Sequence, residues 1–206
     1  MMIKNLGERV KSVWEGLRPM TKEMLVGAMS LPLKSQKFSY DTHADWELSR
    51  LLVALDERLK ETEVKKSVKK LSEINQLAET CIEVLQAQTE SAEVFIQLAE
   101  RALQDRDYEQ IDTLADMMTE RFSVGEMCEI VRQAENPAIR AIAMETIALM
   151  NVEEIIPSLE DPIYQDIARN GLALKAFEYG SMEARQVLEN FDFDEDEDFE
   201  GELEGD

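Results

Sequence analysis

The apolar residues between Ser91 and Met150 recur with the period of an α-helix, and this pattern constrains the fold more than any other feature of the chain. In the first segment they are Val94, Phe95, Leu98, Ala99, Ala102 and Leu103. The spacing lines one face of a helix. A polar break over residues 104–107 separates this segment from a second apolar stripe over 108–118. So short a break predicts an antiparallel pair that leaves an apolar face for a third helix. The residues expected to pack are Phe95, Leu98, Tyr108 and Met118.

The residues of this hairpin resemble a tetratricopeptide-type repeat. Phe95, Leu98 and Ala99 stand in the first helix, and the run Asp107-Tyr108-Glu109-Gln110-Ile111 opens the second. The resemblance covers about one repeat length. Ile111 stands where the family usually has alanine, and the closing proline is missing.

The next hairpin is similar to a HEAT-type unit. It runs from Ser123 to Ala134 and continues from Asn136-Pro137 to Met150. Asparagine as cap with proline in the first helical position is a strong helix start, because the missing proline N–H is not needed there. A second such start, at Asp161, follows 25 residues later, which is short for a two-helix HEAT period. The two resemblances together imply degenerate helical repeats that stack into a solenoid.

The remaining chain also reads as helices. An apolar stripe beginning at Trp46 is interrupted at residues 60–63 and resumes through Leu85, which favours a hairpin over one long helix. Asn151 starts a short helix that Pro157 should stop, and Gly171 is a kink or a point of close packing in the next one. The fold class is all-α: a short right-handed α-solenoid of antiparallel hairpins, preceded by an amphipathic helix and followed by a disordered acidic tail.

Four segments follow from this reading. Residues 1–18 are an amphipathic helix, 19–42 a linker, 43–190 the helical-repeat body and 191–206 the tail. The first helix either docks on the body or detaches to bind a partner's groove or an anionic membrane, through Trp14 and Leu17. The tail has ten acidic and no basic residues, a composition of disordered segments. Its interspersed apolar residues, expected to bind a partner, are Phe191, Phe193, Phe199 and Leu203.

Charge excludes one class of function. The formal net charge is −22, although residues 1–37 hold seven Lys and Arg against three Glu. Nucleic-acid phosphates require clustered cations, so direct nucleic-acid binding is not expected. The dense basic cluster at Lys65, Lys66, Lys69 and Lys70 is read as a solvated helix face that could also receive the acidic tail.

The residue types that usually take part in catalysis are not spaced in a catalytic pattern in this sequence. The single histidine, His43, lies between Asp41 and Asp45 and is read with them as helix-capping residues rather than a metal site. Cys81 and Cys128 fall on apolar helix faces, which predicts packing rather than a disulfide and suits a reducing, cytoplasmic compartment. We expect no catalytic, metal or cofactor residues.

The sequence therefore predicts a non-enzymatic protein–protein interaction module, an adaptor or scaffold that uses a helical-repeat surface and an acidic-aromatic tail on a partner with a basic surface. One alternative is an acidic inhibitor or immunity-type protein that blocks a basic or nucleic-acid-binding partner. A second is peripheral membrane attachment through residues 2–17.

Overall fold

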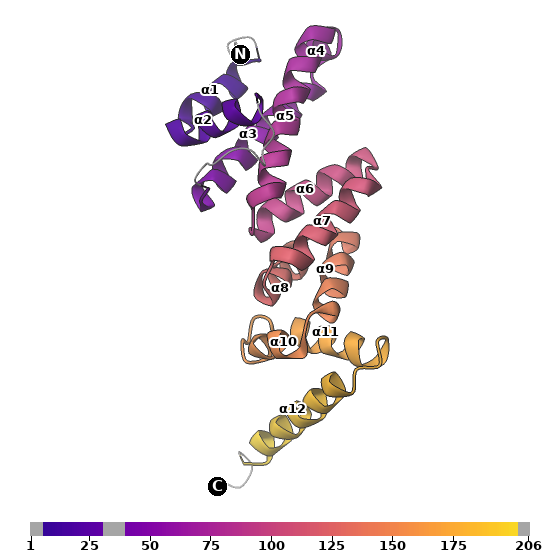
Figure 1. The fold of residues 1–206 in the computed structure, drawn as a ribbon. Coiled ribbons are helices and arrows are strands. Elements are labelled where there is room, and N and C mark those ends of the chain that lie inside the picture. Colours follow the sequence, from indigo (N-terminus) through magenta and orange to yellow (C-terminus); the bar gives the residue numbers. More distant parts are fainter. Residues whose placement is uncertain (1–5, 31–39, 202–206) are drawn as a thin grey trace. The chain divides into compact units, whose positions relative to one another are not determined.

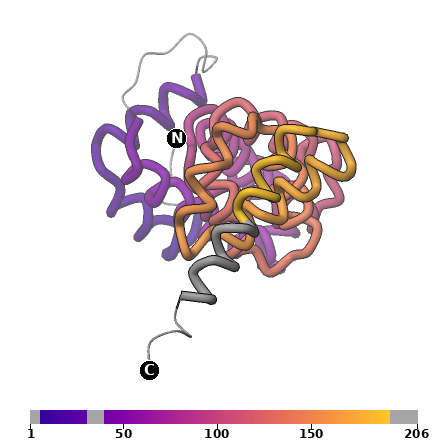
Figure 2. Tube along the Cα trace, turned by 90° about the horizontal axis from the view of Figure 1, so that it is seen from below, coloured from indigo at the N-terminus to yellow at the C-terminus, as the bar shows by residue number. Residues whose placement is uncertain are grey.

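The computed structural model describes residues 6–30 and 40–201, with side chains through Phe191, and this part of the chain is helical with no strand (Figures 1 and 2). It divides into two compact units, residues 1–98 and 99–206. The division falls inside α6, and the 43–190 helical-repeat body stays a prediction. The all-α prediction is confirmed.

The first unit contains five helices and the start of a sixth among its described residues. They are α1 (Glu8–Gly16), α2 (Pro19–Ala28), α3 (Thr42–Lys60), α4 (Thr62–Lys65), α5 (Val68–Gln88) and α6 (Ala92–Asp105). The interruption after residue 60 contains the short helix α4, and the flanking helices α3 and α5 pack along each other. The prediction of a plain linker over 19–42 is corrected, because α2 begins there with Pro19 in its first turn.

Leucines of α3 form the core of this unit. Leu48, Leu51, Leu52 and Leu55 are fully buried and recur at helical spacing. They face the α5 side chains Ile74, Leu77, Cys81 and Leu85, which are also fully buried. Burying each large apolar side chain stabilises the fold by about 1.5–3 kcal/mol. The α1 helix packs on α3 through buried Val10, as the docked alternative predicted.

The second unit completes α6 and, up to Gly201, adds six helices. They are α7 (Tyr108–Arg121), α8 (Val124–Gln133), α9 (Pro137–Leu149), α10 (Val152–Leu159), α11 (Gln165–Phe177) and α12 (Met182–Gly201). The predicted hairpin is present as α8 and α9, which pack on each other. Ser123 and Glu126 form a capping box, and Asn136 accepts a hydrogen bond from the Ala138 N–H at 2.9 Å. These local caps explain why the helix starts were predictable.

Gly171 sets the packing of α11 on α9. A Cβ atom added at Gly171 would lie 2.5 Å from Cγ2 of Ile147, closer than carbon atoms approach. Both residues are buried. The close-packing alternative for Gly171 therefore holds, and the two helices touch at a position where only glycine fits.

Three other expectations need correction. Tyr108 is 68% exposed, whereas Phe95, Leu98 and Met118 are buried as predicted. Pro157 lies inside α10, which continues to Leu159 despite the missing proline N–H. The last helix was expected to end near Asn190 but α12 extends to Gly201. Disorder of the tail stays a prediction, since side chains after Phe191 and all of residues 202–206 lie outside the described part.

Both cysteines are free and buried, as expected for small packing residues. Burial raises the pKa of the Cys128 thiol to about 11 and also raises the pKa of the Cys81 thiol. The reactive form of cysteine is the thiolate, which these environments suppress.

We expect both thiols of the native protein to react with a thiol-specific disulfide reagent at neutral pH at least about a hundredfold more slowly than in denaturant. Rapid reaction of either thiol without unfolding would contradict this.

Candidate protein-interaction surface

A buried carboxylate joins the first three helices. The Arg18 backbone N–H donates to Glu47 Oε1 at 2.7 Å and its Nε donates to Oε2 at 3.0 Å. The two terminal guanidinium nitrogens donate to Asp41, at 2.8 and 2.7 Å. The Thr21 hydroxyl also donates to Glu47. The bend between α1 and α2 is thereby held against the start of α3.

The pKa shifts in this cluster follow from its hydrogen bonds. Hydrogen bonds from Arg18 hold the pKa of Asp41 far below its usual range. Burial alone raises the pKa of Glu47, but hydrogen bonds from Thr21 and from the Arg18 amide and guanidinium lower it overall. Both groups are therefore carboxylates at neutral pH, and Arg18 compensates their charge. This explains how a charge on the buried side of α3 is tolerated.

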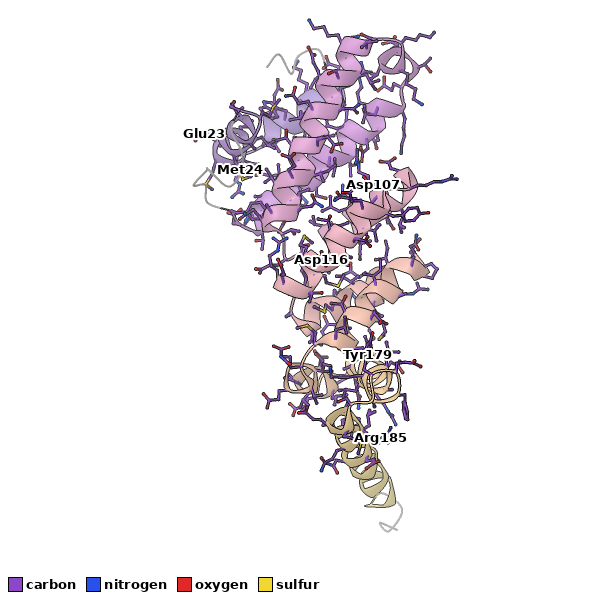
Figure 3. All side chains as sticks on the ribbon, turned by 45° about the vertical axis from the view of Figure 1, so that its right-hand side comes forward. Glu23, Met24, Asp107, Asp116, Tyr179 and Arg185 are labelled. Carbon is purple, nitrogen blue, oxygen red and sulfur yellow. The ribbon has the colours of Figure 1, made fainter. Side chains whose placement is uncertain are left out.

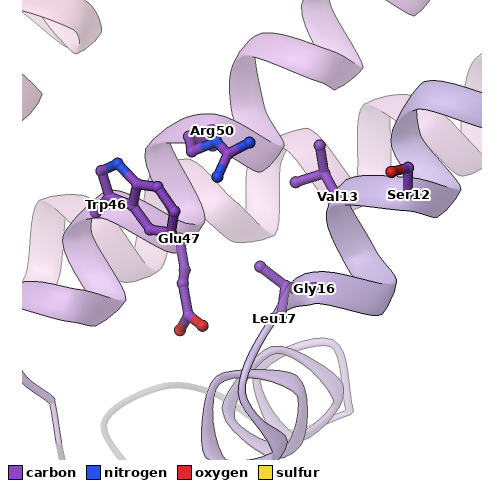
Figure 4. Close-up of a pocket in the computed structure, with 7 residues that line it drawn as sticks. All are labelled: Ser12, Val13, Gly16, Leu17, Trp46, Glu47 and Arg50. Atoms are coloured by element: carbon purple, nitrogen blue, oxygen red, sulfur yellow. The ribbon is translucent and has the colours of Figure 1, made fainter.

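A hollow of about 120 Å³ lies between α1 and α3, immediately beside this cluster (Figure 4). Its lining residues are Ser12, Val13, Gly16, Leu17, Trp46, Glu47 and Arg50. We call it the α1–α3 groove. A Cβ atom added at Gly16 would meet nothing within 4 Å, so that side of the groove is open.

Only one of the two predicted residues of the first helix lines this groove. Leu17 is 5% exposed and lines it, while Trp14 is half-buried. The apolar face of α1 thus packs within the first unit. Membrane attachment would need this same face. The Met2 to Asn5 part of that alternative lies outside the described residues.

Trp46 departs from the sequence prediction most clearly. It was expected to begin the buried stripe of α3, yet it is 59% exposed at the edge of the groove. The Arg50 guanidinium carbon lies 4.4 Å from the centre of the Trp46 ring, and the two side chains stand together in Figure 4. Arg50 makes no ion pair with any described residue. A stacked tryptophan and an unpaired arginine therefore stand at the edge of one hollow.

The second unit carries a stripe of carboxylates on α7. Glu109, Asp112, Asp116 and Glu120 are all exposed and recur every three or four residues, so they share one helix face. Figure 3 shows the Asp116 side chain extending from this helix. The fold thus holds acidic groups in fixed positions, independently of the tail.

Exposed apolar side chains gather where α11 meets α12. Phe177 and Met182 are each 71% exposed, and the Arg185 guanidinium lies 5.7 Å from the Phe177 ring centre. The Tyr179 hydroxyl donates to Glu145 on α9, and Figure 3 shows Tyr179 and Arg185 at this corner. Of the predicted tail residues, Phe191 is half-buried; Phe193, Phe199 and Leu203 lie outside the described side chains.

Glu129 of α8 anchors a smaller cluster in the second unit. Arg132 Nε donates to its carboxylate at 2.8 Å, and the Tyr164 hydroxyl donates at 3.2 Å. Hydrogen bonds from Arg132, Gln133 and Tyr164 lower the pKa of Glu129 to about 2. The cluster ties α8 to the turn that precedes α11.

The lowered pKa predicts how Glu129 contributes to stability. An unfolded glutamate has a pKa of about 4.3, so the unfolded chain binds a proton more readily than the folded one. The contribution is present in full above about pH 5 and is lost as the pH falls towards 2. The difference in free energy of unfolding between wild type and Glu129→Gln should therefore be constant above about pH 5 and should shrink as the pH falls from about 5 towards 2. Chemical denaturation measures it, and exposed Glu135→Gln is the control. A difference that grows on acidification would contradict the prediction.

His43 and Asp41 lie at the start of α3. His43 is exposed, and Asp41 caps α3 by accepting the Ala44 N–H at 3.0 Å. Within residues 6–30 and 40–191, no three carboxylate, histidine or cysteine side chains gather to hold a metal ion. None of the described helices is both long and apolar enough to cross a membrane.

Comparisons with protein-family models, curated proteins and solved structures find no match for this chain.

Proposed function

We propose that this protein is a non-enzymatic protein–protein interaction module, an adaptor or scaffold, and that it binds a partner segment in the α1–α3 groove. The observation that carries the proposal is the exposed Trp46 with Arg50 stacked on it at the groove. Tryptophan and arginine are the residues most enriched among those that dominate binding energy at interfaces. Their stacking also reduces the conformational entropy that each would lose on binding.

The Arg18 cluster supports this proposal by fixing the groove before a partner arrives. One wall belongs to α1 and the other to α3, and Glu47 holds the turn after α1 against α3. A preformed site spends less free energy on ordering than a flexible one. The free, buried cysteines are compatible with the proposed cytoplasmic location.

The repeat assignment belongs to the same proposal. Consecutive antiparallel helices such as α8 and α9, with α11 packing on α9, are what degenerate tetratricopeptide-like or HEAT-like repeats would supply. A right-handed solenoid would follow from stacking such pairs, and a crystal structure of the full chain would test it because the hand of the superhelix can be read directly from the order of the helices.

Selection from a displayed peptide library tests the binding function. We expect the wild-type chain to enrich peptides whose affinity falls at least about thirtyfold in Trp46→Ala, the loss typical of a dominant interface residue. Val26→Ala is the matched control, because Val26 is 51% exposed on α2 but does not line the groove. If no enriched peptide depends on Trp46, the proposed function fails.

The α7 stripe favours the acidic-inhibitor alternative as a second candidate. Fixed carboxylates can cover a basic active site or compete with nucleic acid, and such binding falls steeply with salt. Replacing Asp112 and Asp116 with asparagine should then lower the affinity for the basic partner at least about tenfold, whereas Trp46→Ala should leave that affinity unchanged. The opposite result would assign partner binding to the groove.

A further inference from the structure

We propose that the α1–α3 groove recognises an acidic segment of a partner protein, in which an aromatic side chain and a neighbouring aspartate or glutamate bind side by side. The aromatic ring fills the hollow, and the carboxylate pairs with Arg50. The inference rests on the proposed function, since it names the ligand of the same groove. The charge of this ligand is opposite to that of the basic partner expected from the net charge of the chain.

The groove has the size and the lining for one aromatic side chain. Its volume is about 120 Å³, comparable with the roughly 150 Å³ of an engineered cavity that holds a benzene molecule. The Trp46 ring on α3 and Val13 on α1 provide apolar contact, and the open space at Gly16 leaves an entry (Figure 4). An inserted ring would cover part of Trp46, which is now 59% exposed to water.

Arg50 provides the charge that selects the ligand. Its guanidinium carbon lies 4.4 Å from the centre of the Trp46 ring, and no described residue forms an ion pair with it. Stacking occupies one face of the guanidinium and leaves the N–H groups at its edge able to donate. Such a planar fork binds a carboxylate with two parallel hydrogen bonds. Because the ring already holds the fork, less side-chain freedom is lost when the carboxylate binds.

The other charges at the groove do not oppose an anion. Glu47 is the one carboxylate among the described residues that line the groove, and in Figure 4 it extends away from Arg50. It accepts hydrogen bonds from the Arg18 backbone N–H and Nε, so its charge is already compensated. Residues 1–98 hold 15 acidic and 14 basic residues, so the strong negative charge of the chain does not belong to the unit that forms the groove.

The closeness of Trp46 and Arg50 limits the spacing of the two groups in the partner. The two residues are one helical turn apart on α3 and their side chains are stacked. The ring and the carboxylate that bind them must therefore lie next to each other. Neighbouring residues of an extended segment satisfy this condition, and so do residues three or four apart on a helix, where Cβ atoms are about 5–6 Å apart. Acidic residues elsewhere in the partner would not.

Selection of randomised linear peptides on the full chain tests the class of ligand. We expect the enriched peptides to combine an aromatic residue with aspartate or glutamate at most about four residues away. Selection on Arg50→Glu should keep the aromatic residue and replace the acidic one with lysine or arginine. A loss of folding cannot produce such a change of ligand. Lys69→Glu is the matched charge reversal, because Lys69 is exposed on α5 and does not line the groove; it should leave the enriched sequences unchanged.

Calorimetry with one enriched peptide, made synthetically, tests the contact itself. Its affinity should fall at least about tenfold in Arg50→Gln, and by a similar factor when its acidic residue is replaced by the amide. The two changes together should cost about as much as either alone, since both remove the same pair. In a Trp14→Phe background Trp46 is the remaining tryptophan, and the bound peptide should reduce its quenching by acrylamide at least about twofold.

Three results would overturn the inference. They are Trp46-dependent peptides that lack an acidic residue, an acidic preference that persists in Arg50→Glu, or losses of affinity that are additive in the calorimetric cycle. In each case the proposed function stands, because the peptides still depend on Trp46. The absence of any Trp46-dependent peptide would remove that function as well.

Discussion

Gly171→Ala is expected to destabilise the second unit by about 1–3 kcal/mol, although the same change in an ordinary helix stabilises it by up to about 1 kcal/mol. The reason is the built Cβ position, 2.5 Å from Cγ2 of the buried Ile147. Relief requires α11 to move away from α9 or Ile147 to leave its preferred rotamer, and both lose packing. Chemical denaturation of Gly171→Ala, of Ile147→Ala and of the variant that combines them measures the effect.

The double variant separates this mechanism from a general loss of helix stability. Ile147→Ala alone should cost about 2–5 kcal/mol because it leaves a cavity. Adding Gly171→Ala to it should then cost nothing or restore some stability, since the added methyl group occupies the vacated space. Additive losses would show that Gly171 is not constrained by Ile147. The exposed Gly16, whose added Cβ meets no atom within 4 Å, is the matched control: Gly16→Ala should be neutral or stabilising.

Glu47→Gln is expected to cost about 1–3 kcal/mol, the second of the largest effects. The amide keeps the shape of the carboxylate, but its NH₂ group would face a donor from Arg18 or Thr21. One buried donor is then left without an acceptor, and Arg18 loses part of its charge compensation. The free energy of unfolding at neutral pH measures the loss.

The same helix offers a control for this charge change. Glu57 pairs with Arg9 at 2.5 Å, but its side chain is 44% exposed and that of Arg9 is 66% exposed. Glu57→Gln should therefore change stability by less than about 1 kcal/mol. Because the folded-state pKa of Glu47 is lowered, the gap between wild type and Glu47→Gln should be full above about pH 5 and should diminish as the pH falls. Equal costs for the two substitutions would show that burial of Glu47 has no special role.

Local signals in the sequence determined the helices and many of their ends. Ser123 and Asn136 act as caps because each bonds to an amide within three residues, an interaction that the sequence order itself provides. Gly180 adopts a φ of +68° and Ser181 caps the following helix, conformations that glycine and serine respectively favour. Apolar spacing likewise placed Phe95, Leu98 and Met118 in the core. These features depend on contacts within about one helical turn.

Only the tertiary structure decided how the helical faces are used. Trp46 and Tyr108 have the spacing of core residues, yet both are exposed, because exposure depends on which helix covers a position and not on its period. Arg18 meets Asp41 and Glu47, which lie 23 and 29 residues away, and no local pattern encodes that pairing. The groove arises from the same long-range contacts. The sequence by itself determined an all-α chain with an acidic tail, whereas the placement of Trp46 and Arg50 beside a hollow required the packing of α1 on α3.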